Sequence, residues 1–189
     1  MENSKGSSRR GLKIFCGVTA IFLIIVAVVF VSLAFTIFKP KDPQVFLHPS
    51  GLENLQLANI TSNVTMDMVI TIGNPNYGSF KFRNSTGYVN YRGDVVGEIP
   101  VAEDLVPARS KTNITTSADL MAGKIMTNPE FFGDFLLGNL NMTATAVLHG
   151  KVSVLKIFNL HATTFTTCYI SVFVNSRDIQ STCKSKIKL

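Results

Sequence analysis

The stretch VTMDMVITIGNPNYG, from Val64 to Gly78, indicates how this chain folds. In its first nine residues the apolar side chains occupy every second position, with threonine, aspartate and valine between them. An apolar residue at every second position is typical of a β-strand with one buried face. The strand ends at Gly73-Asn74-Pro75-Asn76-Tyr77-Gly78, which is a dense cluster of turn-forming residues.

Similar segments follow as far as the C-terminus. Strands are predicted at residues 80–82, 87–91, 95–99, 112–118, 140–148 and 152–158, with His149-Gly150 as the turn before the last of these and a final hairpin after it. About eight short strands with frequent turns predict a mainly β, antiparallel β-sandwich.

One short helix is predicted between the strands. Asn128 is a suitable N-cap, Pro129 suits the first helical position, and Glu130 lies where the helix dipole favours an acid. Gly138 is expected to end this helix. Its apolar stripe would consist of Phe131, Phe132, Phe135 and Leu136.

Residues 14–38 form an apolar segment of 25 residues without a charge. As a helix it would reach about 37 Å, enough to cross a hydrocarbon core of ~30 Å. We therefore expect a single transmembrane helix. A cleaved signal peptide is the alternative, because Ser32-Leu33-Ala34 resembles a cleavage site. Signal-peptide cores of ~7–15 residues are shorter than this segment, which favours an uncleaved anchor.

The charges that flank the apolar segment predict its orientation. Lys5, Arg9, Arg10 and Lys13 precede it, whereas Lys39 and Lys41 follow it and are partly offset by Asp42. The excess of positive charge on the N-terminal side predicts a cytosolic N-terminus. Cys16 would then lie just inside the cytosolic edge, either palmitoylated or as a passive thiol facing lipid.

Asn-X-Ser/Thr triplets support the same topology independently. Five occur, all after the apolar segment, where chance would give about two. Glycosylation at these sites requires that this part of the chain enters the lumen of the endoplasmic reticulum. The candidate acceptors are Asn59, Asn63, Asn84, Asn113 and Asn141.

Cys168 and Cys183 would then lie in an oxidising compartment. The residues between them read as strand, turn and strand, with the turn centred on Asn175-Ser176. In such a hairpin the two cysteines face each other across the ladder, and a four-residue loop would make them a non-hydrogen-bonded pair with close side chains. We therefore predict a disulfide between them.

Several motifs of the sequence resemble the plant late-embryogenesis-abundant (LEA) proteins of the second, hydrophobic type, and the resemblance runs from the apolar segment to the C-terminus. The motifs are Asn63–Asp67 and Ile72–Gly78, Tyr91-Arg92-Gly93 with Gly97-Glu98, Val106–Ser110, and the ending Cys183–Leu189. This group overlaps the WHy domain and the membrane-anchored, NDR/HIN-like LEA hydroxyproline-rich glycoproteins, although this chain has no proline-rich tract. The resemblance implies an immunoglobulin- or fibronectin-III-like sandwich. It also implies a role in abiotic stress or pathogen defence, without catalytic residues.

No catalytic, cofactor-binding or metal-binding residues are predicted. His48, His149 and His161 are scattered without ligand spacing, and the adjacent Glu103 and Asp104 suit a solvated loop better than an acid–base pair. The net charge is +6, of which the first 13 residues contribute +3; in the rest of the chain the signs are mixed without a basic stripe containing aromatic residues, so no nucleic-acid partner is expected. Arg92-Gly93-Asp94 spells an adhesion tripeptide, but Gly-Asp is also ordinary turn chemistry.

The predicted organisation is a basic cytosolic tail (1–13), a transmembrane helix (14–38), a stalk (39–54) and an LEA type-2 β-sandwich (55–189). We expect a plasma-membrane protein, or one of another post-ER membrane, whose C-terminal domain is extracellular. Its partners would be the lipid bilayer and an unidentified membrane or cell-surface protein. The alternative function is a lipid-binding or lipid-transfer module, with Phe131, Phe132, Phe135 and the Met66–Met68 face lining an apolar groove.

Overall fold

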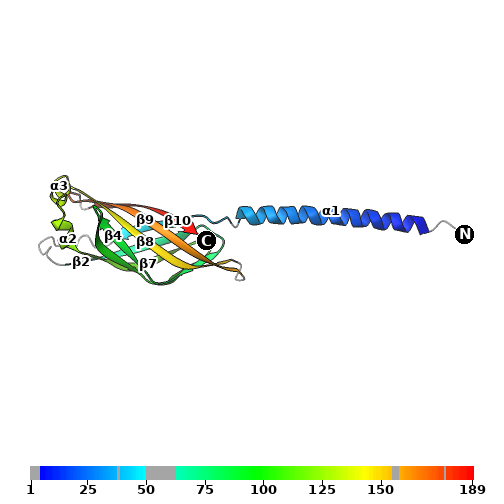
Figure 1. Ribbon diagram of the computed structural model, residues 1–189, viewed down its shortest axis with the longest axis horizontal. Helices are drawn as coiled ribbons and strands as arrows, with labels where there is room; N and C mark the ends of the chain where they lie inside the picture. The colour runs from blue at the N-terminus through cyan, green and yellow to red at the C-terminus, as the bar shows by residue number, and fades with distance from the viewer. Residues whose placement is uncertain (1–4, 38, 50–62, 155–157, 177) are drawn as a thin grey trace. The chain divides into compact units, whose positions relative to one another are not determined.

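The computed structural model describes residues 5–37, 39–49, 63–154, 158–176 and 178–189 (Figure 1). The chain divides into two compact units, Met1–Lys39 and Pro40–Leu189. The first unit contains the helix α1, Lys5–Ile37. Its segment Lys13–Ser32 is, within the described ranges, the one helical segment long and apolar enough to cross a membrane, and its side chains are exposed. The predicted long apolar helix is therefore confirmed.

The second unit is mainly β, as predicted, and its strands belong to one ten-stranded sheet. In chain order the elements are β1 Gln44–Pro49, β2 Val64–Asn74, β3 Ser79–Phe82, β4 Ser85–Tyr91, β5 Asp94–Val101, β6 Asp104–Val106, β7 Ser110–Leu120, α2 Ala122–Thr127, α3 Phe131–Leu136, β8 Asn139–Val154, β9 Phe158–Phe173 and β10 Asp178–Lys188. All strand pairs are antiparallel.

The sheet curls into a nearly closed barrel. Its order runs β1-β2-β7-β5-β4-β8 and continues through β9 to β10, while β3 pairs with the C-terminal part of β8 and carries β6. The edge strands β1 and β10 lie next to each other, where Ser181 Oγ donates to the carbonyl of Leu47 at 3.1 Å. We call this junction the β1/β10 seam. The two sheets expected of a sandwich are thus joined into one, because Gly97 and Glu98 of β5 pair with the end of β7.

The core fills the inside of the barrel. Strand β2 contributes Met68, Ile70 and Ile72 at alternate positions, which confirms the half-buried strand expected at the start. The fully buried side chains of largest volume are Tyr91, Phe82, Val96, Val106 and Thr164. Burial of such apolar surface is the main favourable term in the folding free energy.

Three local predictions were wrong. His149 and Gly150 do not turn the chain, because β8 continues through them to Val154. A Cβ atom on Gly150 would lie 2.9 Å from the Cα of Phe82, so glycine here allows the close approach of β3 and not a turn. Part of the expected stalk forms β1, and Asp104 begins β6 instead of lying in a loop.

The helix prediction was wrong in its number and its boundaries. Two short helices, α2 and α3, replace the one expected, and α3 begins at Phe131 instead of Pro129. Asn128 lies at the C-terminal end of α2, and its Oδ1 accepts a hydrogen bond from the backbone N–H of Glu130 at 3.1 Å. Gly138 follows the end of α3 with a φ of 75°, which glycine adopts without strain.

One buried carboxamide, that of Asn74, joins two turns at the end of the barrel where the chain enters it, which we call the proximal end. Its Nδ2 donates to the carbonyls of Gly78 at 2.8 Å and Pro107 at 3.2 Å, while its Oδ1 accepts from the backbone N–H of Asn76 at 3.0 Å. Asn76 in turn exchanges two hydrogen bonds with the backbone of Lys41. The Asn-Pro-Asn turn therefore connects the incoming chain with the β2–β3 and β6–β7 turns.

Asn74→Asp should lower the free energy of unfolding by about 3 kcal/mol, because the isosteric carboxylate cannot donate and would face buried carbonyl oxygens. Denaturant unfolding of the full chain in a neutral detergent would measure the change. Asn159→Asp is the control, since Asn159 is exposed and accepts from Ser153 through its Oδ1, a role that a carboxylate keeps, and it should shift stability by less than about 0.5 kcal/mol. Equal shifts in the two variants would contradict the role given to Asn74.

Candidate functional site

A network of ionic and hydrogen bonds holds α3 against the β4–β5 turn, at the end of the barrel opposite the proximal end. The phenol of Tyr91 donates to Asp134 Oδ2 at 2.7 Å, although the rest of that side chain is buried in the core. Arg92 donates from Nη2 to Asp134 Oδ1 at 2.7 Å and forms an ion pair with Glu130 at 2.9 Å. We call this end of the barrel the apex.

The network shifts the ionisation of its members. Burial, together with the carboxylate of Asp134, raises the pKa of Tyr91 to about 12. The hydrogen bond from Arg92, and then that from Tyr91, lowers the pKa of the Asp134 carboxyl. The same carboxylate raises the pKa of Arg92. The charged form of the pair is therefore favoured over the whole neutral range, and no member is poised to transfer a proton near pH 7.

The Arg92-Gly93-Asp94 tripeptide forms this turn, with φ values of 51° at Arg92 and 97° at Gly93. Its arginine is bound by the two carboxylates of the apex network, and Asp94 Oδ2 accepts from Asn128 Nδ2 at 3.3 Å. Both charged side chains of the tripeptide are thus engaged inside the domain. The geometry favours the turn interpretation over an adhesion loop.

The outer surface of α3 is apolar and exposed. Phe131 packs against the core, but the other members of the predicted stripe point outwards, since positions 131, 132, 135 and 136 cover more of a short helix than the barrel can bury. Phe132 is 70% exposed, Leu136 74% and Leu137 81%. These three side chains and the less exposed Phe135 are called the apex patch. Contiguous exposed apolar surface is typical of a contact site.

Four of the five predicted glycosylation acceptors lie in the described part of the chain and are exposed: Asn63, Asn84, Asn113 and Asn141. The carboxamides of the last three accept hydrogen bonds through Oδ1, from Glu103 N, Thr71 Oγ1 and Ser171 Oγ respectively. The Nδ2 atom, to which a glycan is attached, is not used in these bonds. Asn59 lies outside the described residues. Glycosylation at these acceptors stays a prediction.

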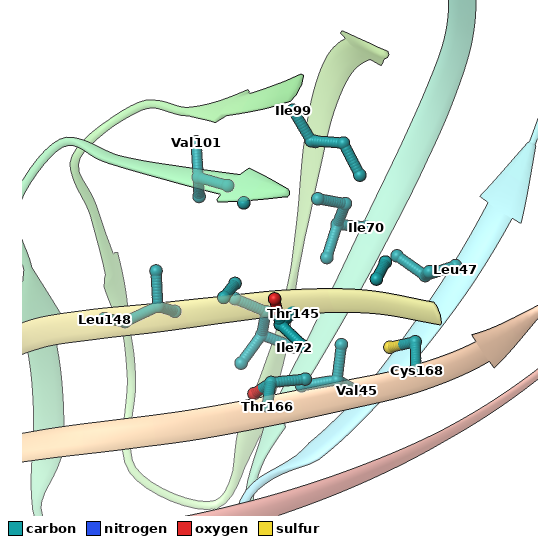
Figure 2. Close-up of a pocket in the computed structure, with 13 residues that line it drawn as sticks. Val45, Leu47, Ile70, Ile72, Ile99, Val101, Thr145, Leu148, Thr166 and Cys168 are labelled. Atoms are coloured by element: carbon teal, nitrogen blue, oxygen red, sulfur yellow. The ribbon is translucent and has the colours of Figure 1, made fainter. Parts of the chain in front are cut away.

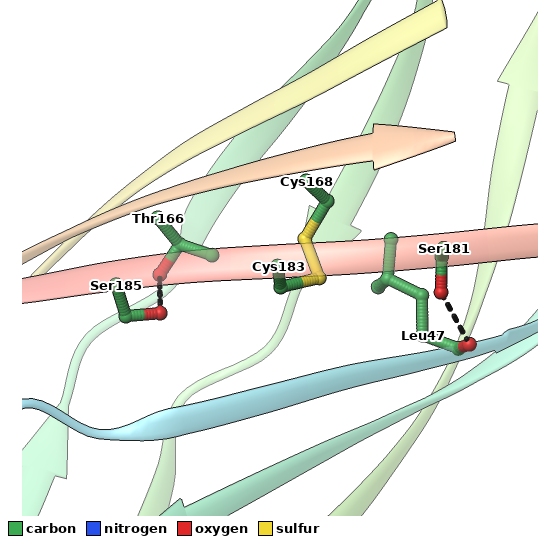
Figure 3. The surroundings of a disulfide bond; sticks show 6 residues. All are labelled: Leu47, Thr166, Cys168, Ser181, Cys183 and Ser185. Carbon is green, nitrogen blue, oxygen red and sulfur yellow. Dashed lines mark hydrogen bonds between the residues drawn. A yellow bond between two sulfur atoms is a disulfide. The ribbon is translucent and has the colours of Figure 1, made fainter. Parts of the chain in front are cut away.

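The predicted disulfide is present between Cys168 of β9 and Cys183 of β10 (Figure 3). The two residues are register partners with Cα atoms 3.9 Å apart, and their hairpin has the four-residue loop considered from the sequence. Figure 3 also shows the flanking hydrogen bonds, Thr166 with Ser185 and Ser181 with the Leu47 carbonyl. The bridge therefore secures β10 beside the seam. Cys16 of α1 is a free, exposed thiol.

Two small apolar cavities lie inside the barrel. The first, of about 50 Å³, is lined by residues that include Val45 and Leu47 of β1, Ile70 of β2 and Cys168 of β9 (Figure 2). The second, of about 30 Å³, is lined partly by Met66 and Met68. The aromatic side chains of α3 line neither cavity. Sites for small organic ligands usually measure about 300–1,000 Å³, so neither cavity holds a lipid in this conformation.

The described residues contain no group of three or more His, Cys, Asp or Glu side chains that could hold a metal ion. His149 Nδ1 lies 3.1 Å from the hydroxyl of Thr163 across the β8–β9 ladder. His161 is exposed on β9, and His48 is on β1. In the β8–β9 register Lys151 lies opposite His161, so His149 and His161 are diagonal neighbours on one face, whereas His48 is on another strand.

No family model matches the sequence, and no curated protein matches it significantly. Among solved structures, the chain is similar to a crystal structure of a protein from Archaeoglobus fulgidus. The match has a TM-score of 0.39 and 9% sequence identity, and it covers 79% of this chain and 99% of that chain. A similarity of this size assigns neither a family nor a function.

The patterns in the sequence did not predict the apex network or the apex patch. Asp134 is 42 residues from Arg92, and nothing local indicates that the two meet. One signal was present: Phe-Phe-Gly-Asp-Phe-Leu-Leu, residues 131–137, holds more apolar side chains than a helix of two turns can bury against one partner.

Tyr91→Phe should lower the free energy of unfolding by about 1–2 kcal/mol, because Asp134 loses one hydrogen bond to its charged form. Since its pKa is raised in the folded state, Tyr91 contributes stability that is complete below pH 10 and is lost as the pH rises towards about 12. The variant should lose less stability over that interval. Unfolding as a function of pH would measure both effects.

Tyr88→Phe is the matched control, since Tyr88 is 44% exposed. This variant should change neither the free energy of unfolding nor the loss of that free energy between pH 10 and about 12 by more than about 0.5 kcal/mol. Identical pH profiles for wild type and Tyr91→Phe would contradict the network.

Proposed function

We propose that this chain is a single-pass (type II) membrane protein with a cytosolic N-terminus and an extracellular, glycosylated β domain. The domain acts as a non-catalytic binding module in the response to abiotic stress or to pathogens. The plasma membrane is the proposed location, with another post-ER membrane as the alternative. Lipid around α1 and a membrane or cell-surface protein at the β domain are the proposed partners.

One observation supports this proposal most directly. The domain that follows the spanning-length helix has a disulfide and four exposed glycosylation acceptors among its described residues. Both modifications require passage through an oxidising secretory compartment. An uncleaved α1 with basic residues before it would place the domain on that side of the membrane.

Membership of the LEA type-2 group, with its immunoglobulin- or fibronectin-III-like sandwich, is part of the proposal. The motifs that carry the resemblance occupy structural positions: Asn74 and Asn76 join the proximal turns, and Arg109 donates to the carbonyl of Pro75. Tyr91 and Arg92 belong to the apex network. Such residues maintain a fold, which agrees with a family that has no catalytic residues.

The apex patch is the proposed contact surface for a protein partner. Its supporting helix is fixed by Asp134 and Glu130, so the apolar side chains are presented with little conformational freedom to lose on binding. Large exposed apolar side chains around a well-held centre are typical of sites that contribute most to a protein interface.

Lipid binding is the second candidate, and the apolar lining of the two cavities favours it. Both cavities lie beside the β1/β10 seam, where side-chain contacts replace a backbone ladder. A lipid would need the seam to open, because the present volumes are several times too small. Native mass spectrometry of the full chain, released from a volatile detergent, should show a protein-only mass if the domain is not a lipid carrier.

The topology is tested in intact cells. Glycosidase treatment should increase the mobility of the full chain on a gel, and external protease should remove the β domain while it leaves a fragment containing α1. Replacing Asn63, Asn84, Asn113 and Asn141 by Gln, together with Asn59, provides the unglycosylated control. Protection of the β domain in intact cells, combined with an unchanged band after glycosidase, would refute the proposed topology.

The role of the apex patch is tested by complementation of a loss-of-function line under drought and pathogen challenge. Phe132→Ser with Leu136→Ser should fail to restore the response although the protein reaches the membrane in normal amount. Leu105→Ser with Leu160→Ser removes two side chains that are 47% and 49% exposed elsewhere, and this variant should restore it. A loss-of-function line indistinguishable from its parent under both challenges would argue against the function itself.

A further inference from the structure

The C-terminal part of the barrel is strongly basic. From Phe135 to Leu189 the sequence has six basic residues and one acidic residue, Asp178. Strands β8 and β9 contain no acidic residue at all. The positive net charge of this domain is therefore concentrated in the segment that contains the last three strands, of which β8 and β10 carry Lys151, Lys184, Lys186 and Lys188.

The strand register brings these charges to one side of the sheet. Lys81 of β3 pairs with Lys151 of β8, and Lys151 pairs with His161 of β9. Residues directly opposite each other in a ladder point to the same face, and alternate residues along a strand do so too.

The same rule places three more lysines on this outer face. Lys188 lies opposite Thr163, Lys186 opposite Phe165 and Lys184 opposite Thr167, all at exposed positions of β9 and β10 or partly exposed ones. We call the exposed Lys81, Lys151, Lys184, Lys186 and Lys188, with the residues between them, the basic sheet face. It measures about 13 Å along β10 and about 14 Å across four strands.

The lysines of this face are not neutralised within the domain. No ion pair joins any of the five to a carboxylate in the described part of the chain. Two of them lie over aromatic rings: Lys188 Nζ is 5.3 Å from the centroid of Phe165, and Lys184 Nζ is 6.0 Å from that of Tyr169. Such contacts hold an ammonium group near the surface without cancelling its charge.

Between the charges the face carries hydroxyl groups and exposed rings. Phe165 is 42% exposed and Tyr169 53%. Val147 lies opposite Phe165, and the other outward positions beside the two rings include Thr143, Thr145, Thr163, Thr167 and Thr182. Aromatic rings pack on the C–H faces of sugars, hydroxyl groups hydrogen-bond sugar hydroxyls, and ammonium groups attract carboxylates. The face thus has a complement for each chemical group of an acidic sugar.

We propose that the basic sheet face binds an acidic polysaccharide, a polymer with a carboxylate on each sugar. Several carboxylates of one chain reach the lysines of β10 and those of β8 and β3 together, so weak individual contacts add up. The choice of a polysaccharide rests on the proposed extracellular position of the domain.

An anionic membrane is the competing partner for such a face, and the observations favour the polymer. The threonines offer hydroxyl groups that a hydrocarbon interior would not satisfy. The strongly anionic leaflet also faces the cytosol, on the other side of the membrane from the proposed domain.

The test uses the full chain in a neutral detergent and needs no assumption about topology. Binding to immobilised polygalacturonate is compared with binding to dextran, a neutral polymer. The wild-type chain should bind the first, release it as salt is raised, and ignore the second. Lys184→Gln with Lys186→Gln should bind about tenfold more weakly.

Lys111→Gln with Lys124→Gln is the matched control, since it removes the same charge from β7 and α2. This control should bind within about twofold of wild type. Lys151→Gln gives a second test of the face on another strand, should the β10 variant fail to fold.

Equal weakening in the two double variants would show a mere effect of net charge and would overturn the proposal. Equal binding to dextran and to polygalacturonate would also overturn the proposal. Stronger binding to phosphatidylserine-containing vesicles than to polygalacturonate would overturn it as well. A failure here leaves the topology unaffected, because glycosidase and protease test that separately.

Discussion

The buried carboxamide of Asn74 is the constraint on which the proximal end of the barrel depends. Where strands end, backbone carbonyls leave the ladder, and they must find other donors if they are buried. Asn74 donates to two such carbonyls through its Nδ2 and accepts a backbone N–H through its Oδ1. This one side chain therefore fixes the β2–β3 turn against Pro107. The register of β2 with β7, which sets the core of the barrel, begins directly beside it at Asn74 and Ser110.

The two ends of the barrel meet the same requirement with different chemistry. At the proximal end, amides and backbone groups are bound to one another, and Asn76 holds the incoming chain at Lys41. At the apex, charged side chains hold α3, and the apolar residues of that helix remain outside the core. Internal hydrogen bonding explains the first arrangement fully. The second leaves exposed apolar surface that folding alone does not require.

Much of the fold could be predicted from the sequence, because local patterns determine it. The alternation in β2 and the spacing of Cys168 and Cys183 each report a short-range geometry, and the structure confirms both. The failures come from contacts between distant residues. From the sequence Gly150 suits a turn, but in the structure β3 packs closely against it. Residues 44–49 likewise suit a linker, but in the structure they pair with β2. Closure of the sheet and the salt bridge from Arg92 to Asp134 have no local signal of this kind.

The positions of the glycosylation acceptors bear on which surfaces remain open for binding. Asn141 shares the outer face of β8 with Thr145, which is in register with Lys184 through Thr167, and lies four residues beyond it, about 13 Å along the strand. Asn113 is on β7, on the other side of the sheet order from β9 and β10. Asn84 lies just beyond β3, at the margin of the basic sheet face. Glycans at these sites would therefore border that face instead of covering it, and would leave its lysines accessible to a charged polymer.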